Sequence, residues 1–226
     1  LAASLDQGSE HPLAHAIVDH ARGQGIALVK PDTFESGSGI GVRGQVDGQP
    51  VVLGNGALMS EAAIDWQPLA QQAEALRVEG ATVIFIAVDK NIAGLFAITD
   101  PLKPSARKAI TFLHDQGQRL VMLTGDHPLT AQTIARQLNI DEVQAEVLPA
   151  QKSQAIVDLK SQGRTVAMVG DGVNDAPALA IADVGIAMGT GTDVALESAK
   201  IVLLNGDLAN LVRALNLSKT TRQNIR

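Results

Sequence analysis

Cysteine is absent from this sequence of 226 residues, and aromatic residues make up only 2% of it. Without cysteine the chain has no disulfide framework and no thiolate metal site, so a bound metal would be held by oxygen or imidazole ligands. The absence fits a reducing compartment. Hydrophobic residues still make up 46% of the chain. We therefore expect a core of Ala, Val, Ile and Leu side chains, which favours packed helices and buried β-branched strands.

Basic runs and long apolar runs are absent as well. The formal net charge is -6, and nucleic-acid binders neutralise phosphates with clustered Lys and Arg, so no nucleic-acid partner is expected. No apolar segment approaches the roughly 18 to 20 residues that span a bilayer. Leu1 starts neither a signal peptide nor a typical translation product. These features predict a soluble segment of a longer protein.

The first half of the chain is expected to form a small α+β unit. A helix is predicted from about Ser9 to Arg22, with Ser9 as its cap and Pro12 in its first turn. Asp47-Gly48 predicts a hairpin turn, because this pair tolerates positive φ. The other expected elements are the two hairpin strands Val42–Val46 and Pro50–Leu53, a helix at Ala70–Glu79, and strands Thr82–Val88 and Ile92–Ile98.

From Asp100 onward, helical patterns alternate with short apolar strands, which is typical of βαβ units and a parallel sheet. The segment Asp100–Pro104 is interpreted as a hinge, because its two prolines restrict the backbone. The expected strands are Leu120–Leu123, Val143–Ala145, Thr165–Val169, Val184–Ala187 and Ile201–Leu204. The expected helices are Pro104–Gln116, Pro128–Leu138, Gln151–Gln162, Ala176–Ala182 and Asp207–Arg226.

Two polar clusters follow strands of the predicted parallel sheet, at the edge where such sheets bind ligands. They are Thr124-Gly125-Asp126 and the run from Gly170 to Asp175, which includes Asp171 and Asn174. A simpler interpretation is that Asp126 and Asp175 only cap the next helices. Asp171 lies between glycines, so its carboxylate is expected to be exposed and to suit a hard cation such as Mg²⁺.

Three further patterns have competing interpretations. Lys152 at the start of a helix can neutralise a phosphoryl oxygen, or can be an ordinary surface lysine. The run Gly39–Gly44 matches G-x-G-x-x-G but precedes a strand, so the dinucleotide-binding interpretation fails, and there is no P-loop sequence. The glycine-rich turn Gly37–Gly41 can admit a flat ligand or be a plain tight turn. His11 and His15 share a helical face, but no third zinc ligand is evident.

Taken together, the sequence closely resembles the heavy-metal-transporting P-type ATPases, most of all the copper exporters. The resemblance rests on Ser9-Glu10-His11-Pro12-Leu13, Gly37-Ser38-Gly39-Ile40-Gly41, Gly54-Asn55, Asp100-Pro101-Leu102-Lys103, Thr124-Gly125-Asp126 and Gly170-Asp171-Gly172-Val173-Asn174-Asp175. It implies an α/β fold in which 1–98 belong to a nucleotide-binding domain that began before this chain. Residues 99–215 would form a parallel-sheet phosphorylation domain of the haloacid dehalogenase-like fold, and 216–226 would begin a membrane stalk helix.

The resemblance also implies roles for individual residues. In the first domain, His11 would lie next to the adenine of ATP, Gly37 and Gly39 would line it, and Gly54 and Asn55 would close the pocket. Glu10 is included in this site, and Asp6 stands where the family often has the longer Glu.

In the second domain, Thr124 and Lys152 would hold the phosphoryl group, with Gly125 and Asp126 in the same turn. Asp171 would bind Mg²⁺, and Asn174 and Asp175 would order the loop, with Asp175 as a second possible Mg²⁺ ligand. The family's nucleophile is the first Asp of Asp-Lys-Thr-Gly-Thr, which does not occur in this sequence. Asp89-Lys90-Asn91 is only a superficial match.

The implied function is ATP binding and phosphoryl transfer on the cytoplasmic face of a membrane-bound Cu⁺ exporter. The transported ion would bind to membrane helices outside the sequence, and without the nucleophile the chain alone is expected to be inactive. The alternatives are the same portion of a zinc or cadmium pump, a soluble haloacid dehalogenase-like phosphatase with a cap domain, and a regulatory nucleotide-binding module.

Overall fold

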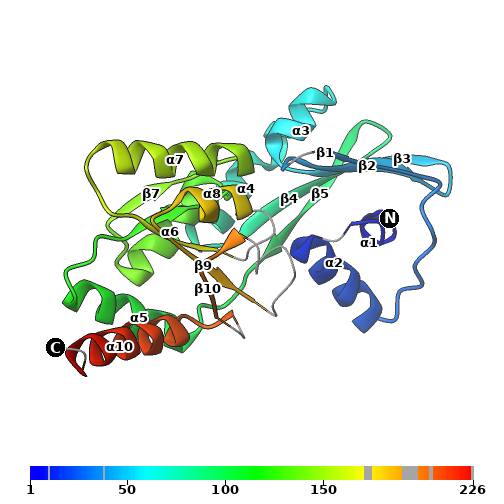
Figure 1. Cartoon of the computed structure of the whole chain (residues 1–226). Helices are drawn as coiled ribbons and strands as arrows, with labels where there is room; N and C mark the ends of the chain where they lie inside the picture. Colours follow the sequence, from blue (N-terminus) through cyan, green and yellow to red (C-terminus); the bar gives the residue numbers. More distant parts are fainter. Residues whose placement is uncertain (10, 38, 171–174, 190–197, 204–205, 225–226) are drawn as a thin grey trace. The chain divides into compact units, whose positions relative to one another are not determined.

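The computed structural model describes the chain except for residues 10, 38, 171–174, 190–197, 204–205 and 225–226. The chain divides into two compact units, Leu1–Asp100 and Pro101–Arg226 (Figure 1). The division lies within the segment Asp100–Pro104, where two prolines stiffen the backbone. Each unit has its own strands and its own hydrophobic cores.

The sheet of the first unit is a five-stranded antiparallel meander in the order β1-β2-β3-β4-β5. Asp47 and Gly48 form the predicted turn between β2 and β3, and their φ angles of 51° and 73° are the positive values that such a turn favours. The strands are β1 (Thr33–Gly37), β2 (Gly41–Val46), β3 (Gln49–Gly54), β4 (Thr82–Val88) and β5 (Asn91–Ile98).

Helices cover both faces of this sheet. Along β4, Val83, Phe85 and Ala87 point into one core, while Ile84 and Ile86 pack against the other, as the alternation of a strand requires. One face carries α1 (Ala2–Asp6) and α2 (Pro12–Gly23). The other carries α3 (Gly56–Glu61), the short 3₁₀ helix η1 (Gln67–Leu69) and α4 (Ala70–Val78).

The predicted start of α2 is wrong. The helix begins at Pro12, and its N-cap is His11 rather than Ser9. Ser9 instead accepts a hydrogen bond at Oγ from the His11 backbone N–H, at 3.3 Å, in the turn before the helix. Proline is favourable at the first helical position because it has no N–H to leave unpaired, so the residue before it becomes the cap.

The second unit contains parallel strands and helices in alternation, as predicted. Its elements are α5 (Pro104–Asp115), β6 (Val121–Leu123), α6 (Pro128–Leu138), β7 (Glu142–Gln144), α7 (Pro149–Ser161), β8 (Ala167–Gly170), α8 (Ala176–Ile181), β9 (Val184–Met188), β10 (Ile201–Leu203) and α10 (Leu208–Asn224). All three pairings, β6 with β7, β8 with β9 and β9 with β10, are parallel. They form two separate sheets, however, because no hydrogen-bonded pairing of described residues joins β6 to β8.

Both faces of these sheets are buried, which parallel strands require. Met168 of β8 and Ala187 of β9 pack against α7 and α8 in one core. Their sequence neighbours Val169 and Ile186 point the other way, into a core with α5 and α10, which run side by side in Figure 1. Among the described helices, none is long and apolar enough to cross a membrane.

Two aspartates join the strand pairs at the ends where the strands begin. Asp141, just before β7, accepts a hydrogen bond from the backbone N–H of Leu120, just before β6, at 2.7 Å. Asp183, just before β9, accepts from the N–H of Val166, just before β8, at 2.8 Å. These backbone N–H bonds are the main reason that the pKa of each carboxyl lies below its ordinary value.

Candidate functional site

Three glycines align across neighbouring strands at one end of the first unit's sheet. Gly37 of β1 pairs with Gly41 of β2, and Gly41 pairs with Gly54 of β3. A Cβ on Gly41 would overlap the carbonyl oxygen of Leu53, a Cβ on Gly54 would overlap that of Ile40, and Gly41 has a φ of 138°. Glycine is therefore required here, because neighbouring backbone occupies the space of a side chain at both positions and the φ of Gly41 disfavours one.

The turn between β1 and β2 is tied to the end of β3. The backbone N–H of Asn55 donates to the carbonyl of Ile40 at 2.9 Å, and Gly39 in the same turn has a φ of 76°. The structure thus brings together Gly37, Gly39, Gly54 and Asn55, which the sequence assigned to one site. Asn55 is also the N-cap of α3, because its Oδ1 accepts from the N–H of Leu58 at 3.0 Å.

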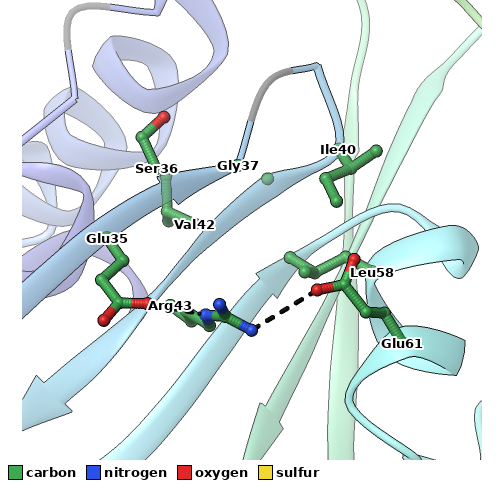
Figure 2. A pocket seen from close by; sticks show the side chains of 9 residues that line it. Glu35, Ser36, Gly37, Ile40, Val42, Arg43, Leu58 and Glu61 are labelled. Atoms are coloured by element: carbon green, nitrogen blue, oxygen red, sulfur yellow. Dashed lines mark hydrogen bonds and ion pairs between the residues drawn. The ribbon is translucent and has the colours of Figure 1, made fainter.

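A small pocket lies beside this turn (Figure 2). Arg43 crosses it and pairs with Glu35 at 2.9 Å and with Glu61 at 3.5 Å. The pocket encloses about 60 Å³, far less than the roughly 300 to 1,000 Å³ of a typical small-molecule site. It is therefore too small to hold a nucleotide by itself. The ion pair between Arg43 and Glu61 connects the β1–β2 hairpin to the end of α3.

Asp6, at the end of α1, is only 5% exposed, although it is a carboxylic acid. Within the described part of the chain, no group donates a hydrogen bond to its carboxylate. Burial raises the pKa of Asp6 to about 6, because desolvation penalises the charged form. Burial of an ionised carboxyl is costly unless hydrogen bonds compensate it.

His11 is exposed, and its ring is oriented by its role as the cap of α2. The backbone N–H of Leu13 donates to Nδ1 of His11 at 3.2 Å. Only a neutral imidazole with its proton on Nε2 can accept at Nδ1. No hydrogen bond of the described residues joins the ring to the Gly37–Gly41 turn. Among the described residues, which include His15, no group of three or more His, Asp or Glu side chains is arranged to bind a metal ion.

In the second unit, Thr124 and Asp126 form a compact turn after β6. Thr124 Oγ1 donates to Asp126 Oδ2 at 3.0 Å, and the N–H of Asp126 donates back to Thr124 Oγ1 at 3.1 Å. A Cβ on Gly125 would meet nothing closer than 3.7 Å, at the carbonyl of Val147. The interpretation of Asp126 as the cap of α6 is wrong, because His127 occupies that position.

Backbone hydrogen bonds connect this turn to the start of α7, which carries Lys152. Val147 N–H donates to the carbonyl of Thr124 at 2.9 Å, and Glu146 N–H donates to that of Asp126 at 3.0 Å. The next residue, Leu148, is the N-cap of α7, and Lys152 lies in the first turns of that helix. Thr124, Asp126 and Lys152 are therefore part of one framework.

Lys152 and Asp175 form a short ion pair between the starts of α7 and α8. Nζ lies 2.6 Å from Oδ1, and the two side chains are only 17% and 11% exposed. Asp175 occupies the N-cap position of α8, as the simpler interpretation expected, but its side chain makes no cap bond and pairs with Lys152 instead. The interpretation of Lys152 as an ordinary surface lysine is wrong. A Cβ on Gly170 would lie 2.7 Å from Cβ of Asp175, so Gly170 makes room for the pair.

Three residues assigned from the sequence, Glu10, Asp171 and Asn174, lie outside the described residues. Two others that shape the site were missed. Gly170 was noted only as a flank of Asp171. For His127 the sequence does contain a signal, because His127-Pro128-Leu129 repeats the tripeptide His11-Pro12-Leu13.

Comparison with known proteins gives a consistent picture. Residues 1–183 match the haloacid dehalogenase-like hydrolase family. The chain is 53% identical, over all of its length, to a copper-transporting P-type ATPase of Rhizobium leguminosarum bv. viciae. It is 54% identical, over 99% of its length, to a silver-exporting P-type ATPase of Salmonella typhimurium. In both cases it spans 27% of the relative, about a quarter of its length.

Solved structures agree with these sequence matches. The catalytic domain of the CPx-ATPase CopB-B, in a study of its changes upon nucleotide binding, superposes with a TM-score of 0.71 at 30% identity. That match covers 94% of this chain and 76% of the solved chain. A zinc-transporting PIB-type ATPase in the E2.Pi state gives a TM-score of 0.66 at 38% identity, over all of this chain and 36% of that one.

Proposed function

Because this chain belongs to the haloacid dehalogenase-like hydrolase family and, within it, to the heavy-metal-transporting P-type ATPases, we propose that it is the ATP-handling portion of a Cu⁺ exporter. Such a portion would lie on the cytoplasmic face of the membrane and would pass the γ-phosphoryl group of ATP to an aspartate. The buried Lys152–Asp175 pair, tied through the backbone to the Thr124–Asp126 turn, carries the proposal. A cation held beside the Thr124–Asp126 turn is the kind of group that would neutralise a transferring phosphoryl group.

We assign nucleotide binding to residues 1–98. The glycine-rich turn Gly37–Gly41 and Asn55 lie together at one end of the sheet, where the turn would line a flat ring. The oxygen of Asn55 caps α3, so its NH₂ group would be the part that contacts a ligand. Asp6 would accept a hydrogen bond from an amino group such as that of adenine. His11, oriented by its cap bond, would offer its Nε2–H. Glu10 belongs to the same proposed site.

We assign phosphoryl transfer to residues 99–215. Lys152 and the Thr124 hydroxyl would neutralise and hydrogen-bond phosphoryl oxygens, while Asp175 keeps Lys152 in place. Side-chain oxygen atoms at this edge are the hard ligands that Mg²⁺ prefers. We assign Asp171 as the Mg²⁺ ligand and Asn174 to the ordering of the loop. Mg²⁺, when bound, would neutralise charge on the transferring group.

The aspartate that accepts the phosphoryl group must come from outside these residues, since the sequence contains no Asp-Lys-Thr-Gly-Thr. The two parallel sheets suggest where its strand would pair. Leu123 of β6 shares one core with Met168 of β8, and Leu120 shares the opposite core with Val169, yet β6 and β8 are not hydrogen-bonded to each other. We infer that a further strand fits between them. The chain alone would then bind ATP without hydrolysing it.

Titration of the chain with Mg²⁺ and ATP, followed by NMR of backbone amides, tests the nucleotide site. We expect shifts at His11, Gly37, Gly39 and Asn55, and none at Gly25, a glycine of the same unit with nothing within 4 Å of its Cβ position. An absence of shifts at the first four residues would remove the nucleotide-site assignment. Binding that does not respond to Mg²⁺ would favour a regulatory nucleotide-binding module.

The transported ion is proposed from overall similarity to the copper relative. The silver-exporting relative is equally similar at 54% identity, so Ag⁺ is a second candidate. Zinc or cadmium is less favoured, because the zinc-transporting structure is 38% identical. Metal-stimulated ATPase activity of the longer protein decides this: Cu⁺ or Ag⁺ should stimulate it and Zn²⁺ should not. A soluble phosphatase would show no metal-stimulated activity at all.

A further inference from the structure

The tripeptide His-Pro-Leu occurs twice and forms the same helix start in each unit. At α6, the N–H of Leu129 donates to Nδ1 of His127 at 3.3 Å, and His127 has φ −61° and ψ 143°. At α2, the corresponding bond from Leu13 to His11 measures 3.2 Å, with φ −72° and ψ 138°. In both cases proline occupies the first helical position. The antiparallel first unit and the parallel second unit therefore use the same kind of helix N-cap.

Histidine is an unusual residue for this position, because Ser, Thr, Asp and Asn are the preferred N-caps. It can replace them only while its ring is neutral and its proton is on Nε2, since Nδ1 must accept. Proline contributes by fixing its own φ at the first helical position and by confining its predecessor to extended backbone. The extended ψ values of both histidines are those of a residue so confined.

At α6 the cap adjoins the turn that carries Thr124 and Asp126. Val147 and Glu146 hold this turn on one side by donating to its carbonyls. On the other side the chain passes directly from Asp126 to His127, and the carbonyl of His127 accepts the first helical hydrogen bond from Ala131 at 3.0 Å. The orientation of Asp126 therefore depends on where the cap places the start of α6.

We propose that His127 is a positioning residue for the Thr124–Gly125–Asp126 turn, acting through its Nδ1 cap of α6. The importance of His127 for phosphoryl binding rests on the proposed function of that turn. The effect of the cap on the turn does not depend on that function, so the cap and the function can be tested separately. His11 provides an internal comparison, because its cap is the same but its unit lacks this turn.

Amide hydrogen exchange of the whole chain tests this proposal without any ligand. The variants are His127→Ala, which removes the cap acceptor, and His127→Asn, which restores a good one. Loss of a cap worth about 1 kcal/mol corresponds to about a fivefold loss of protection. We expect His127→Ala to lower protection about fivefold at Leu129 and also at Asp126, and His127→Asn to restore both. His11→Ala is the matched control and should affect Leu13 while leaving Asp126 unchanged.

Three outcomes would overturn the proposal. The first is loss of protection at Leu129 alone in His127→Ala, which would make His127 a cap without influence on the turn. The second is failure of His127→Asn to restore Asp126, which would mean that the ring acts by something other than its acceptor. The third is loss of protection at Asp126 in His11→Ala, which would mark the effect as general destabilisation.

Discussion

Asp6 is a carboxylic acid that the fold largely buries, although its charged form is more favourably solvated in water. Its carboxyl is nearly buried, and the described residues give it no hydrogen-bond donor. The folded protein therefore binds a proton at Asp6 more tightly than the unfolded chain does, with a pKa of about 6 against an ordinary 3.8. A favourable contribution to folding is thus present below the unfolded pKa and is lost as the pH rises through about 6.

Asp6→Asn should remove this penalty. We expect the variant to be more stable than the parent chain at pH 7, by on the order of 2 kcal/mol, and equally stable near pH 4. Urea unfolding between pH 4 and pH 8 measures the difference. Asp19→Asn, at an exposed position of α2, is the control and should follow the parent at every pH. Parallel curves for Asp6→Asn and the parent would show that the buried carboxyl is not destabilising.

The Lys152–Asp175 pair predicts a large effect of removing one partner. Lys152→Met leaves the Asp175 carboxylate buried without its cation, which should cost about 2 to 4 kcal/mol of unfolding free energy. Lys160→Met is the matched control, because the Lys160–Asp183 pair is 35% and 36% exposed and such pairs contribute less than about 1 kcal/mol. Equal losses in the two variants, measured by denaturant unfolding, would contradict the assignment of Lys152 to a buried pair.

For single residues, the sequence predicted which residues belong to the candidate site better than it predicted which residues they contact. The glycines, Asn55, Thr124 and Lys152 occur in recognisable strings, so their grouping was predictable. The pairing of Lys152 with Asp175 was not, because it depends on how α7 and α8 pack. The burial of Asp6 was not predictable either, since it follows from the docking of a short helix on β2 and β3.

Like α2, helix α3 has a cap residue that also belongs to the proposed nucleotide site. Asn55→Asp keeps the cap, because aspartate caps as well as asparagine, whereas Asn55→Ala loses it at a cost of about 1 kcal/mol. We expect only the alanine variant to be less stable in thermal unfolding. Both should bind ATP more weakly, because both lack the NH₂ group. Full ATP affinity in Asn55→Asp would reduce Asn55 to a structural role.

The strand starts of the second unit give an acid-sensitive feature. The carboxylates of Asp141 and Asp183 accept backbone N–H bonds that lower their pKa, so their stabilisation is present above about 3.8 and is lost as the pH falls through the lower folded values. Protection of the Leu120 and Val166 amides should therefore fall in strong acid. With Asp141→Asn and Asp183→Asn this fall should disappear, since the amide does not titrate. An unchanged acid profile in the double variant would refute the link.

The accuracy of the predicted elements follows the strength of their local signals. The bounds of α6 were predicted correctly, because Pro128 opens it and Asn139, with a left-handed φ of 59°, ends it. β1 was missed because it is an edge strand with mostly exposed side chains. α1 spans only five residues, which is too short to show helical periodicity or to be stable alone. Such elements exist through packing, which sequence patterns do not reveal.

For the whole molecule, the sequence patterns were sufficient to predict a small α+β unit followed by a unit with parallel strands. They were not sufficient to predict that the parallel strands form two sheets, because strand order is set by long-range pairing. We propose different roles for the two units. The first unit would bind the nucleotide, the second would hold the phosphoryl group, and the absent aspartate would be needed for turnover.

The most direct test of this account measures ATP binding and phosphate release in the same sample of the chain with Mg²⁺. Calorimetry should give saturable binding at a single site, weakened in His11→Ala, while a phosphate assay detects no release above a blank without protein. Absence of saturable binding would contradict the proposed nucleotide site. Phosphate release by the chain alone would contradict the claim that the phosphorylated aspartate lies outside these residues.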